Sequence, residues 1–256
     1  MRGLMIQLQV IHALIVREMM TRFGEHRLGY LWAFIEPLIW IGMFAGMYTL
    51  VDRAVLPGMS VVAFLATGFM PFLLFRNEAT KNLAAISSNK NLLFYPRIRP
   101  LDLLCARSVL EFATSYTVFF VLMAGASLYE GALHFDNLLL VTGGFILAAS
   151  LGVGLGMIFC SLSTFSTSFE RLLGPLLRPF FWGSCLFYSV DSVPPQVRDV
   201  LLYNPLVHAI TLVRGGCYMA YDSQYTNMWY PAMWALGLLF IGLTLERVVR
   251  RRIQLS

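Results

Sequence analysis

Long apolar runs separated by short polar intervals constrain this sequence more than any other feature. An α-helix needs about 20 consecutive, mostly apolar residues to cross the hydrocarbon core of a bilayer, and several runs approach or reach that length. The chain is 58% hydrophobic and 13% charged, whereas a soluble domain carries about 25% charged residues. The sequence therefore predicts an all-α, polytopic integral membrane protein.

Six of these runs are the expected transmembrane helices, and they cover residues 31–51, 60–75, 108–129, 138–162, 172–190 and 231–245. Another apolar segment, Leu4 to Thr21, precedes them, but polar residues interrupt it too often for it to span. We expect it to be an interfacial helix on the inner leaflet. The alternative, a frayed start of the first span, would bury Arg22, Glu25 and Arg27 in the bilayer.

The uneven distribution of positive charge predicts the orientation. The interval from Arg76 to Arg107 holds six of the nineteen Lys and Arg residues, and sixteen of the nineteen fall on the same side as this interval. Arg53, Arg198 and Arg214 are the three assigned to the outer side. Because cationic loops stay in the cytoplasm, both termini are expected there. The net charge of +5 follows from this topology, so no nucleic acid binding is inferred.

The longest outer segment covers residues 191–230. Its middle is too apolar for a solvated loop and too interrupted to span, which favours a re-entrant pair of short helices. In the fourth span, Gly152 and Gly156 favour close helix packing. We expect one membrane domain over 1–256, with an interfacial helix and hinge (1–30), spans one to five (31–190), the outer segment (191–230), and the last span with a basic tail (231–256). The first dozen residues lack the features of a cleaved secretory signal.

The interval 76–107 also has the form of a surface for a cytoplasmic partner. A helix-compatible run from Glu78 to Ser88 is followed by Asn89-Lys90-Asn91 and then by Pro96 and Pro100. Proline ends helical propagation, so a short helix followed by a loop is expected here.

The first span carries a stripe of five residues that recur every four positions: Trp32, Glu36, Trp40, Phe44 and Tyr48. On one interpretation the stripe lines a conduit, because flat aromatic faces can slide along sugar rings. On the other, Trp32 and Tyr48 anchor the helix at the membrane interfaces and the other residues pack between helices. Glu36 favours the conduit, since a carboxylate inside a span usually faces protein or water.

The fifth apolar run contains Arg178 between Pro175 and Pro179. A proline-broken span that carries an arginine is costly unless it borders protein or water. Either Arg178 extends to the inner interface, or it faces a pore and meets an anionic substrate.

No catalytic or metal-binding motif is found in the sequence. There is no GxxxxGK loop, no HExxH and no GxSxG, so we expect no enzyme activity and no nucleotide site of that kind on this chain. The four cysteines, Cys105, Cys160, Cys185 and Cys217, show no metal spacing; we expect free thiols, the alternative being a Cys185–Cys217 disulfide. An intramembrane enzyme or a carrier is the less favoured alternative function.

Three segments resemble a known family: Arg22 to Pro37 (RFGEHRLGYLWAFIEP), Leu92 to Arg107 (LLFYPRIRPLDLLCAR) and Tyr203 to Arg214 (YNPLVHAITLVR). With them the chain resembles the permease of an ABC-2 type polysaccharide exporter over essentially its whole length. It is most similar to the capsular polysaccharide export permeases of Gram-negative bacteria. Permeases for O-antigen or teichoic acid share the pattern seen at Leu28 to Pro37, and they are the alternative.

The resemblance implies the ABC-2 (type V exporter) fold in the inner membrane and a homodimer that works with two copies of a cytoplasmic ATPase. ATP and Mg would bind to that ATPase, and no cofactor is expected on this chain. The implied substrate is a lipid-linked acidic polysaccharide. A periplasmic copolymerase and an outer-membrane channel are further implied partners, and segment 191–230 is the natural place for their contact.

The resemblance places the ATPase contact in segment 77–91. The expected ATPase-coupling residues are Lys81, Asn82, Asn89, Lys90, Asn91, Phe94, Tyr95 and Pro96. The expected substrate-access or channel residues are Arg22, Arg27, Tyr30, Trp32, Glu36, Trp40, Phe44, Tyr48 and Arg178. We expect Arg22 and Arg27 to gather the anionic lipid-linked end at the inner leaflet. The alternative is that both are only positive-inside anchors.

Overall fold

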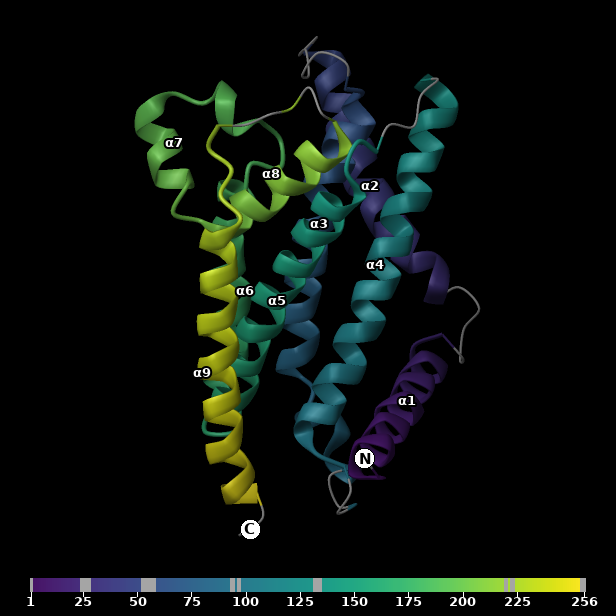
Figure 1. Cartoon of the computed structure of the whole chain (residues 1–256), viewed down its shortest axis with the longest axis vertical. Coiled ribbons are helices and arrows are strands. Elements are labelled where there is room, and N and C mark those ends of the chain that lie inside the picture. Colours follow the sequence, from purple (N-terminus) through teal and green to yellow (C-terminus); the bar gives the residue numbers. More distant parts are fainter. Residues whose placement is uncertain are drawn as a thin grey trace.

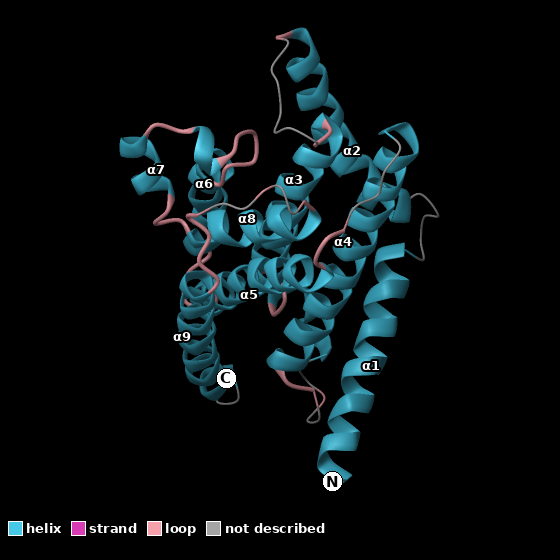
Figure 2. Ribbon diagram, turned by 45° about the horizontal axis from the view of Figure 1, so that its top comes forward, coloured by secondary structure: helices cyan, strands magenta, loops and turns pink. Residues whose placement is uncertain are grey.

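A computed structural model describes residues 2–23, 29–51, 59–92, 95, 98–130, 135–218, 221 and 224–253. Within these residues every regular element is helical (Figures 1 and 2). The elements are α1 (Arg2–Phe23), α2 (Gly29–Leu50), α3 (Val61–Leu83), the 3-10 helix η1 (Ser87–Leu92), α4 (Pro100–Glu130), α5 (Leu138–Ser163), α6 (Ser168–Gly183), the 3-10 helix η2 (Val190–Ser192), α7 (Pro195–Leu201), α8 (Pro205–Cys217) and α9 (Trp229–Ile253). The predicted all-α class is confirmed.

Five helices in the described residues are long and apolar enough to cross a membrane. They contain the segments Leu31–Leu50, Val61–Leu83, Pro100–Leu128, Leu138–Ser163 and Trp229–Val249. These segments overlap the expected spans one to four and six. The expected fifth span, 172–190, corresponds to α6, which has 16 residues, begins earlier and ends at Gly183. The helix ends there because Ser184 and Cys185 leave helical geometry, with φ of 56° at Cys185.

Helix α3 forms the centre of the bundle, and α5 packs directly against it. Ser60 caps α3 by accepting a hydrogen bond from the Ala63 N–H at 3.0 Å. A Cβ on Gly152 would lie 2.5 Å from the Phe75 carbonyl oxygen, and one on Gly156 would lie 2.7 Å from Asn82 Cβ. The two glycines therefore allow the close approach predicted for the fourth span.

Two helix boundaries differ from the sequence prediction. Pro100 begins α4 rather than ending a helix, since the first position of a helix does not require the N–H that proline lacks. Helix α3 continues without interruption through Pro71 to Leu83, and the short helix expected from residue 78 is therefore its last part. Only η1 forms a separate element before α4.

The two ends of the bundle carry different elements. Helix α1 and the C-terminal end of α9 lie at one end, whereas α7 and α8 lie at the other (Figure 1). Helix α8 is almost fully buried against α3 and α5, and Asn204 caps its start by accepting a hydrogen bond from the Leu206 N–H at 3.0 Å. The predicted pair of short helices in segment 191–230 is thus present as α7 and α8.

Helix α1 packs beside the first half of α4 (Figures 1 and 2). Leu14 forms a buried cluster with Leu103 and Ala106 of α4, and the Gln7 amide donates to Asp102. This packing explains why the polar interruptions of α1 are tolerated: part of its polar face is turned toward another helix. Residues 24–28, which belong to the hinge expected within 1–30, and Arg53 on the expected outer side lie outside the described residues.

Candidate functional site at the junction of α1, α3 and α4

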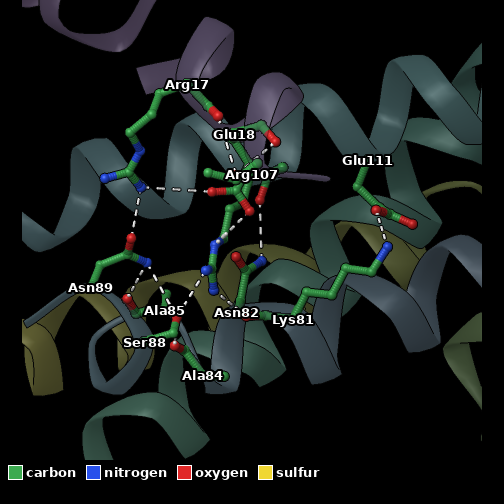
Figure 3. Close-up of polar contacts among 12 residues, drawn as sticks. Arg17, Glu18, Lys81, Asn82, Ala84, Ala85, Ser88, Asn89, Arg107 and Glu111 are labelled. Atoms are coloured by element: carbon green, nitrogen blue, oxygen red, sulfur yellow. Dashed lines mark hydrogen bonds and ion pairs between the residues drawn. The ribbon is translucent and has the colours of Figure 1, made fainter. Parts of the chain in front are cut away.

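Arg107 on α4 is the centre of a cluster of polar residues, which we call the polar junction (Figure 3). Its Nε lies 3.2 Å from Glu18 Oε1 on α1, its Nη1 donates to the Lys81 carbonyl oxygen at 2.9 Å, and its Nη2 donates to Ser88 Oγ at 2.8 Å. One guanidinium thus connects α1, the last turn of α3 and η1. The other members of the junction are Arg17, Asn82, Asn89 and Glu111.

Two of the three asparagines predicted to couple to an ATPase, Asn82 and Asn89, face the interior of the junction. Asn89 is buried; it accepts from Arg17 Nη2 at 2.6 Å and its amide donates to the Ala85 carbonyl oxygen at 3.0 Å. The Asn82 amide donates to Glu78 at 3.0 Å and to Ser108 at 3.1 Å. These side chains therefore fix the shape of the segment rather than present a surface.

Lysine and arginine on α3 connect the junction to the neighbouring helices. Lys81 Nζ lies 2.5 Å from Glu111 Oε2 on α4, and Arg76 forms an ion pair with Glu36 on α2. Asn77 donates to the second oxygen of Glu111 at 3.0 Å. Since each pair joins two helices, the end of α3 is held from both sides.

Part of the predicted coupling segment is exposed within the described residues. Asn91 is exposed, and Tyr95 keeps 62% of its surface accessible. The side chain of Lys90 and residues Phe94 and Pro96 lie outside the described residues. Within the described part, Asn91 and Tyr95, and the 39% exposed side chain of Lys81, are therefore the positions of this set that offer a surface to a partner.

The aromatic stripe of α2 divides into two parts. Phe44 and Tyr48 are buried: Trp40 stacks on Phe44 with centroids 6.3 Å apart, Phe44 lies 4.2 Å from Phe187, and the Tyr48 hydroxyl donates to the Phe187 carbonyl oxygen. This is the arrangement that the packing interpretation predicts for Trp40 and Phe44, but Tyr48 is an inward-facing residue and not an interfacial anchor. Trp32, by contrast, is 62% exposed.

A pocket of about 210 Å³ brings together residues from both predicted sets. Trp32 and Glu36 of α2 line it together with Lys81 of α3 and Glu111 of α4. An exposed indole face beside paired charges and the neighbouring Thr114 and Ser115 can accommodate a hydroxylated, charged group.

The remaining predicted residues are more dispersed. Arg178 is exposed on α6, so both interpretations of it stay open. The side chains of Arg22 and Tyr30, and the whole of Arg27, lie outside the described residues. All four cysteines are free, as predicted, and no group of three metal-ligating side chains occurs in the described part of the chain.

Sequence reasoning did not identify Arg17, Glu18 and Arg107 as partners in one cluster. The adjacent opposite charges of Arg17 and Glu18 inside an apolar segment were a signal that this face meets protein. Arg214, assigned to the outer side by the charge count, is fully buried in α8. An arginine followed by two glycines in an apolar stretch carried no sign of that position.

Several apolar helices of spanning length, together with a charged junction that links their ends, define a multi-pass membrane protein. The chain belongs to the ABC-2 type transporter family, which matches residues 9–218. It is 33% identical to the polysialic acid transport protein KpsM of Escherichia coli, over 96% of this chain and 95% of that protein. It is 31% identical to the capsule polysaccharide export inner-membrane protein CtrC of Neisseria meningitidis serogroup B, over 95% and 92%, and 27% identical to BexB, the protein of the same description from Haemophilus influenzae, over 96% and 93%. The chain is thus a transporter permease, and ATP hydrolysis is the task of a separate subunit.

Proposed function

We propose that this chain is the permease of an ATP-driven exporter that moves lipid-linked acidic capsular polysaccharide from the cytoplasm across the inner membrane. The observation that carries the proposal is the similarity to capsule export proteins over more than nine-tenths of both chains. A similarity limited to the core of the bundle would support a transporter but not a capsule exporter. The similarity to KpsM also covers the predicted coupling segment and the segment 191–230.

In this proposal two copies of the chain work with two copies of a cytoplasmic ATPase. The ATPase binds ATP and Mg, and this chain holds no cofactor. The ATPase contacts the exposed side of η1 and Tyr95. A push on η1 displaces Ser88 and Asn89, which are hydrogen-bonded to Arg107 of α4 and Arg17 of α1. The polar junction therefore transmits the movement to three helices at once, because its charges are joined to one another.

The proposed topology has six crossings, with α6 as the fifth and both termini in the cytoplasm. The position of α1 and the end of α9 at the same end of the bundle supports an even number of crossings (Figure 1). The α7–α8 pair would then be the re-entrant segment on the periplasmic side. Its exposed residues, such as Val200 and Tyr203, are the proposed surface for a periplasmic copolymerase and, through it, an outer-membrane channel.

The proposed substrate path begins where the anionic lipid-linked end meets Arg22 and Arg27, with Tyr30 nearby in the sequence. It continues past the pocket of Trp32 and Glu36. Arg178 is a further cation that the substrate can meet. The buried residues Phe44 and Tyr48 are left out of this path, since they pack inside the subunit.

The test is affinity purification of the tagged permease from membranes in mild detergent, with detection of the bound ATPase. Replacing Tyr95 by alanine should reduce ATPase recovery about tenfold or more, because truncating an exposed aromatic anchor at an interface typically costs about 2 kcal/mol or more. The matched control is Tyr203→Ala, which removes an exposed tyrosine between α7 and α8 and should leave recovery unchanged. A parent permease purified without any ATPase would contradict the proposal.

A further inference from the structure

The chain between α6 and η2, residues 184–189, is not helical, yet it is tightly held. Three successive carbonyl oxygens of this segment, those of residues 186–188, accept hydrogen bonds from side chains of other helices. Arg214 of α8 donates through Nη2 to Leu186 and through Nη1 to Tyr188, both at 3.0 Å, and the Tyr48 hydroxyl of α2 donates to Phe187 between them. We call residues 184–189 the strap.

Arg214 is fully buried, so the strap and the guanidinium depend on each other. The guanidinium also lies over the ring of Phe64, 4.1 Å from its centroid. A Cβ on Gly68 would lie 2.8 Å from Nη2 and 2.9 Å from the Leu186 carbonyl oxygen, which shows how closely α3 approaches both. A buried charge is costly unless it is hydrogen-bonded, and neutral backbone carbonyls supply those bonds here. Moving the strap away would leave the guanidinium without them.

The strap places Phe187 in an aromatic cluster between three helices. The Phe187 centroid lies 4.2 Å from that of Phe44 on α2, 5.4 Å from Phe69 on α3, and 5.4 Å from Phe181 on α6. The ring is therefore a wedge that joins α2 to α6. Because Tyr48 is hydrogen-bonded to the carbonyl oxygen of Phe187 itself, the ring of Phe187 cannot leave the cluster without a change in the backbone hydrogen bonds of the strap.

We propose that the strap is a latch between α2 and α6, and that Arg214 and Tyr48 are the positioning residues that hold it closed. The proposal rests on the proposed function, in which the substrate path runs along α2. Opening that path moves α2 relative to α6, and this movement withdraws Phe187 from the cluster and breaks the three hydrogen bonds. All of these contacts are noncovalent, so they can form again after each passage.

The strap contains its own reporter. Cys185 is fully buried in a cluster with Val190 and Val207, and Cys217 in α8 is equally buried but lies outside the strap. The experiment uses two single-cysteine chains, one that keeps Cys185 and one that keeps Cys217, with the other three cysteines replaced by serine or alanine. Both are labelled in membranes with a membrane-impermeant maleimide. Release of the strap exposes Cys185 alone, whereas general loosening of the fold exposes both cysteines.

Removing one hydrogen bond should accelerate the labelling of Cys185. We expect about a fivefold increase for Tyr48→Phe, which deletes only the hydroxyl, and a larger increase for Arg214→Lys, which keeps the charge but loses the fork that reaches two carbonyls. Labelling of Cys217 should stay unchanged in the same backgrounds. Equal labelling of Cys185 in the parent and in Tyr48→Phe, or a parallel rise at Cys217, would overturn the latch.

A second arm separates the latch from a fixed structural contact. With the ATPase bound, ATP turnover should increase the labelling of Cys185 in the unmodified strap but not that of Cys217. An ATPase that stays bound and hydrolyses ATP while Cys185 labelling remains at its resting rate would overturn the latch and leave the export function intact. Failure of the ATPase to bind would contradict the proposed function instead, and the Tyr48→Phe arm, which needs no ATPase, would then decide the latch.

Discussion

Glu18 of α1 and Arg107 of α4 form an ion pair in which both side chains are mostly buried, with Oε1 3.2 Å from Nε. Exposed ion pairs contribute little, about 0–1 kcal/mol, but this guanidinium also donates to α3 and to η1. Arg107 is therefore shared by four elements. Removing Glu18 leaves a partly buried cation whose remaining acceptors are neutral.

Glu18→Gln should uncouple α1 from the polar junction. We expect a loss of about 1–3 kcal/mol in the interaction of α1 with α4, as for a hydrogen bond to a charged group, and a several-fold lower export rate while the ATPase remains bound. Polysaccharide appearing at the cell surface, normalised to permease in the membrane, is the measurement. Glu170→Gln on α6 is the matched control, since Glu170 is exposed and lies outside the junction. Equal export in both variants would show that α1 does not need this pair.

Gly156→Ala should destabilise the contact between α3 and α5. The added Cβ would meet Asn82 Cβ at 2.7 Å and the carbonyl oxygens of Ala79 and Glu78 at 3.0 Å, and backbone at that distance cannot yield cheaply. Overpacking of this kind costs about 1–3 kcal/mol, measured as a lower unfolding temperature in detergent. Gly125→Ala on α4 meets nothing within 4 Å and should be neutral or slightly stabilising. A Gly156→Ala protein as stable as the parent would mean that the helices can separate at no cost.

The sequence was sufficient to predict the helices that are apolar along their whole length. Spans such as 138–162 are set by apolar length alone, and α5 matches that range within one residue. The predicted end of the fifth run, residue 190, is wrong because apolar composition continues through residues 184–190, whereas helical backbone geometry ends at Gly183. Local composition cannot show that Arg214, far along the chain, holds these carbonyls.

The sequence predicted where in the chain the candidate site lies, but not which way its side chains point. The interval 76–107 was located from its charges, but the direction of each side chain depends on partners distant in sequence. Asn89 faces inward because Arg17 approaches from α1. Tyr48 faces inward because the Phe187 carbonyl meets it. A four-residue repeat in α2 specifies one face of a helix, but it cannot specify whether substrate or protein covers that face.

Replacing Arg22 and Arg27 together by glutamine should reduce export while the protein level in the membrane holds. Each cation near an anionic surface contributes about 1 kcal/mol, so the pair should account for roughly a tenfold to thirtyfold change in recruitment of an anionic lipid-linked end. The loss should shrink at high salt, because screening weakens exposed charges. The control is Arg171→Gln, an exposed arginine on α6. Unchanged export at matched protein levels would leave the two arginines as topology signals only.

His208 should make the fold sensitive to acid. Its Nδ1 accepts from the Asn227 N–H at 3.3 Å while its Nε2 lies 3.0 Å from the Leu202 carbonyl oxygen; this arrangement fits the neutral ring, since an imidazolium has no acceptor nitrogen. Burial keeps the pKa of His208 below its ordinary value of 6.5. Between the folded and unfolded pKa values, only the unfolded chain binds the proton. The stabilisation is therefore complete above about pH 6.5 and is lost as the pH falls below it, by up to about 1.4 kcal/mol per pH unit.

The measurement for His208 is the unfolding temperature of the detergent-solubilised protein between pH 7.5 and 5.5. The parent should lose stability over this window, and His208→Gln, which cannot titrate, should show a flatter profile from a lower starting value. His12→Gln is the matched control, because His12 is exposed on α1 and should leave the slope of the parent unchanged. A His208→Gln protein with the same slope as the parent would assign the acid sensitivity to the carboxylates. In that case His208 would bind its proton equally well in the folded and in the unfolded chain.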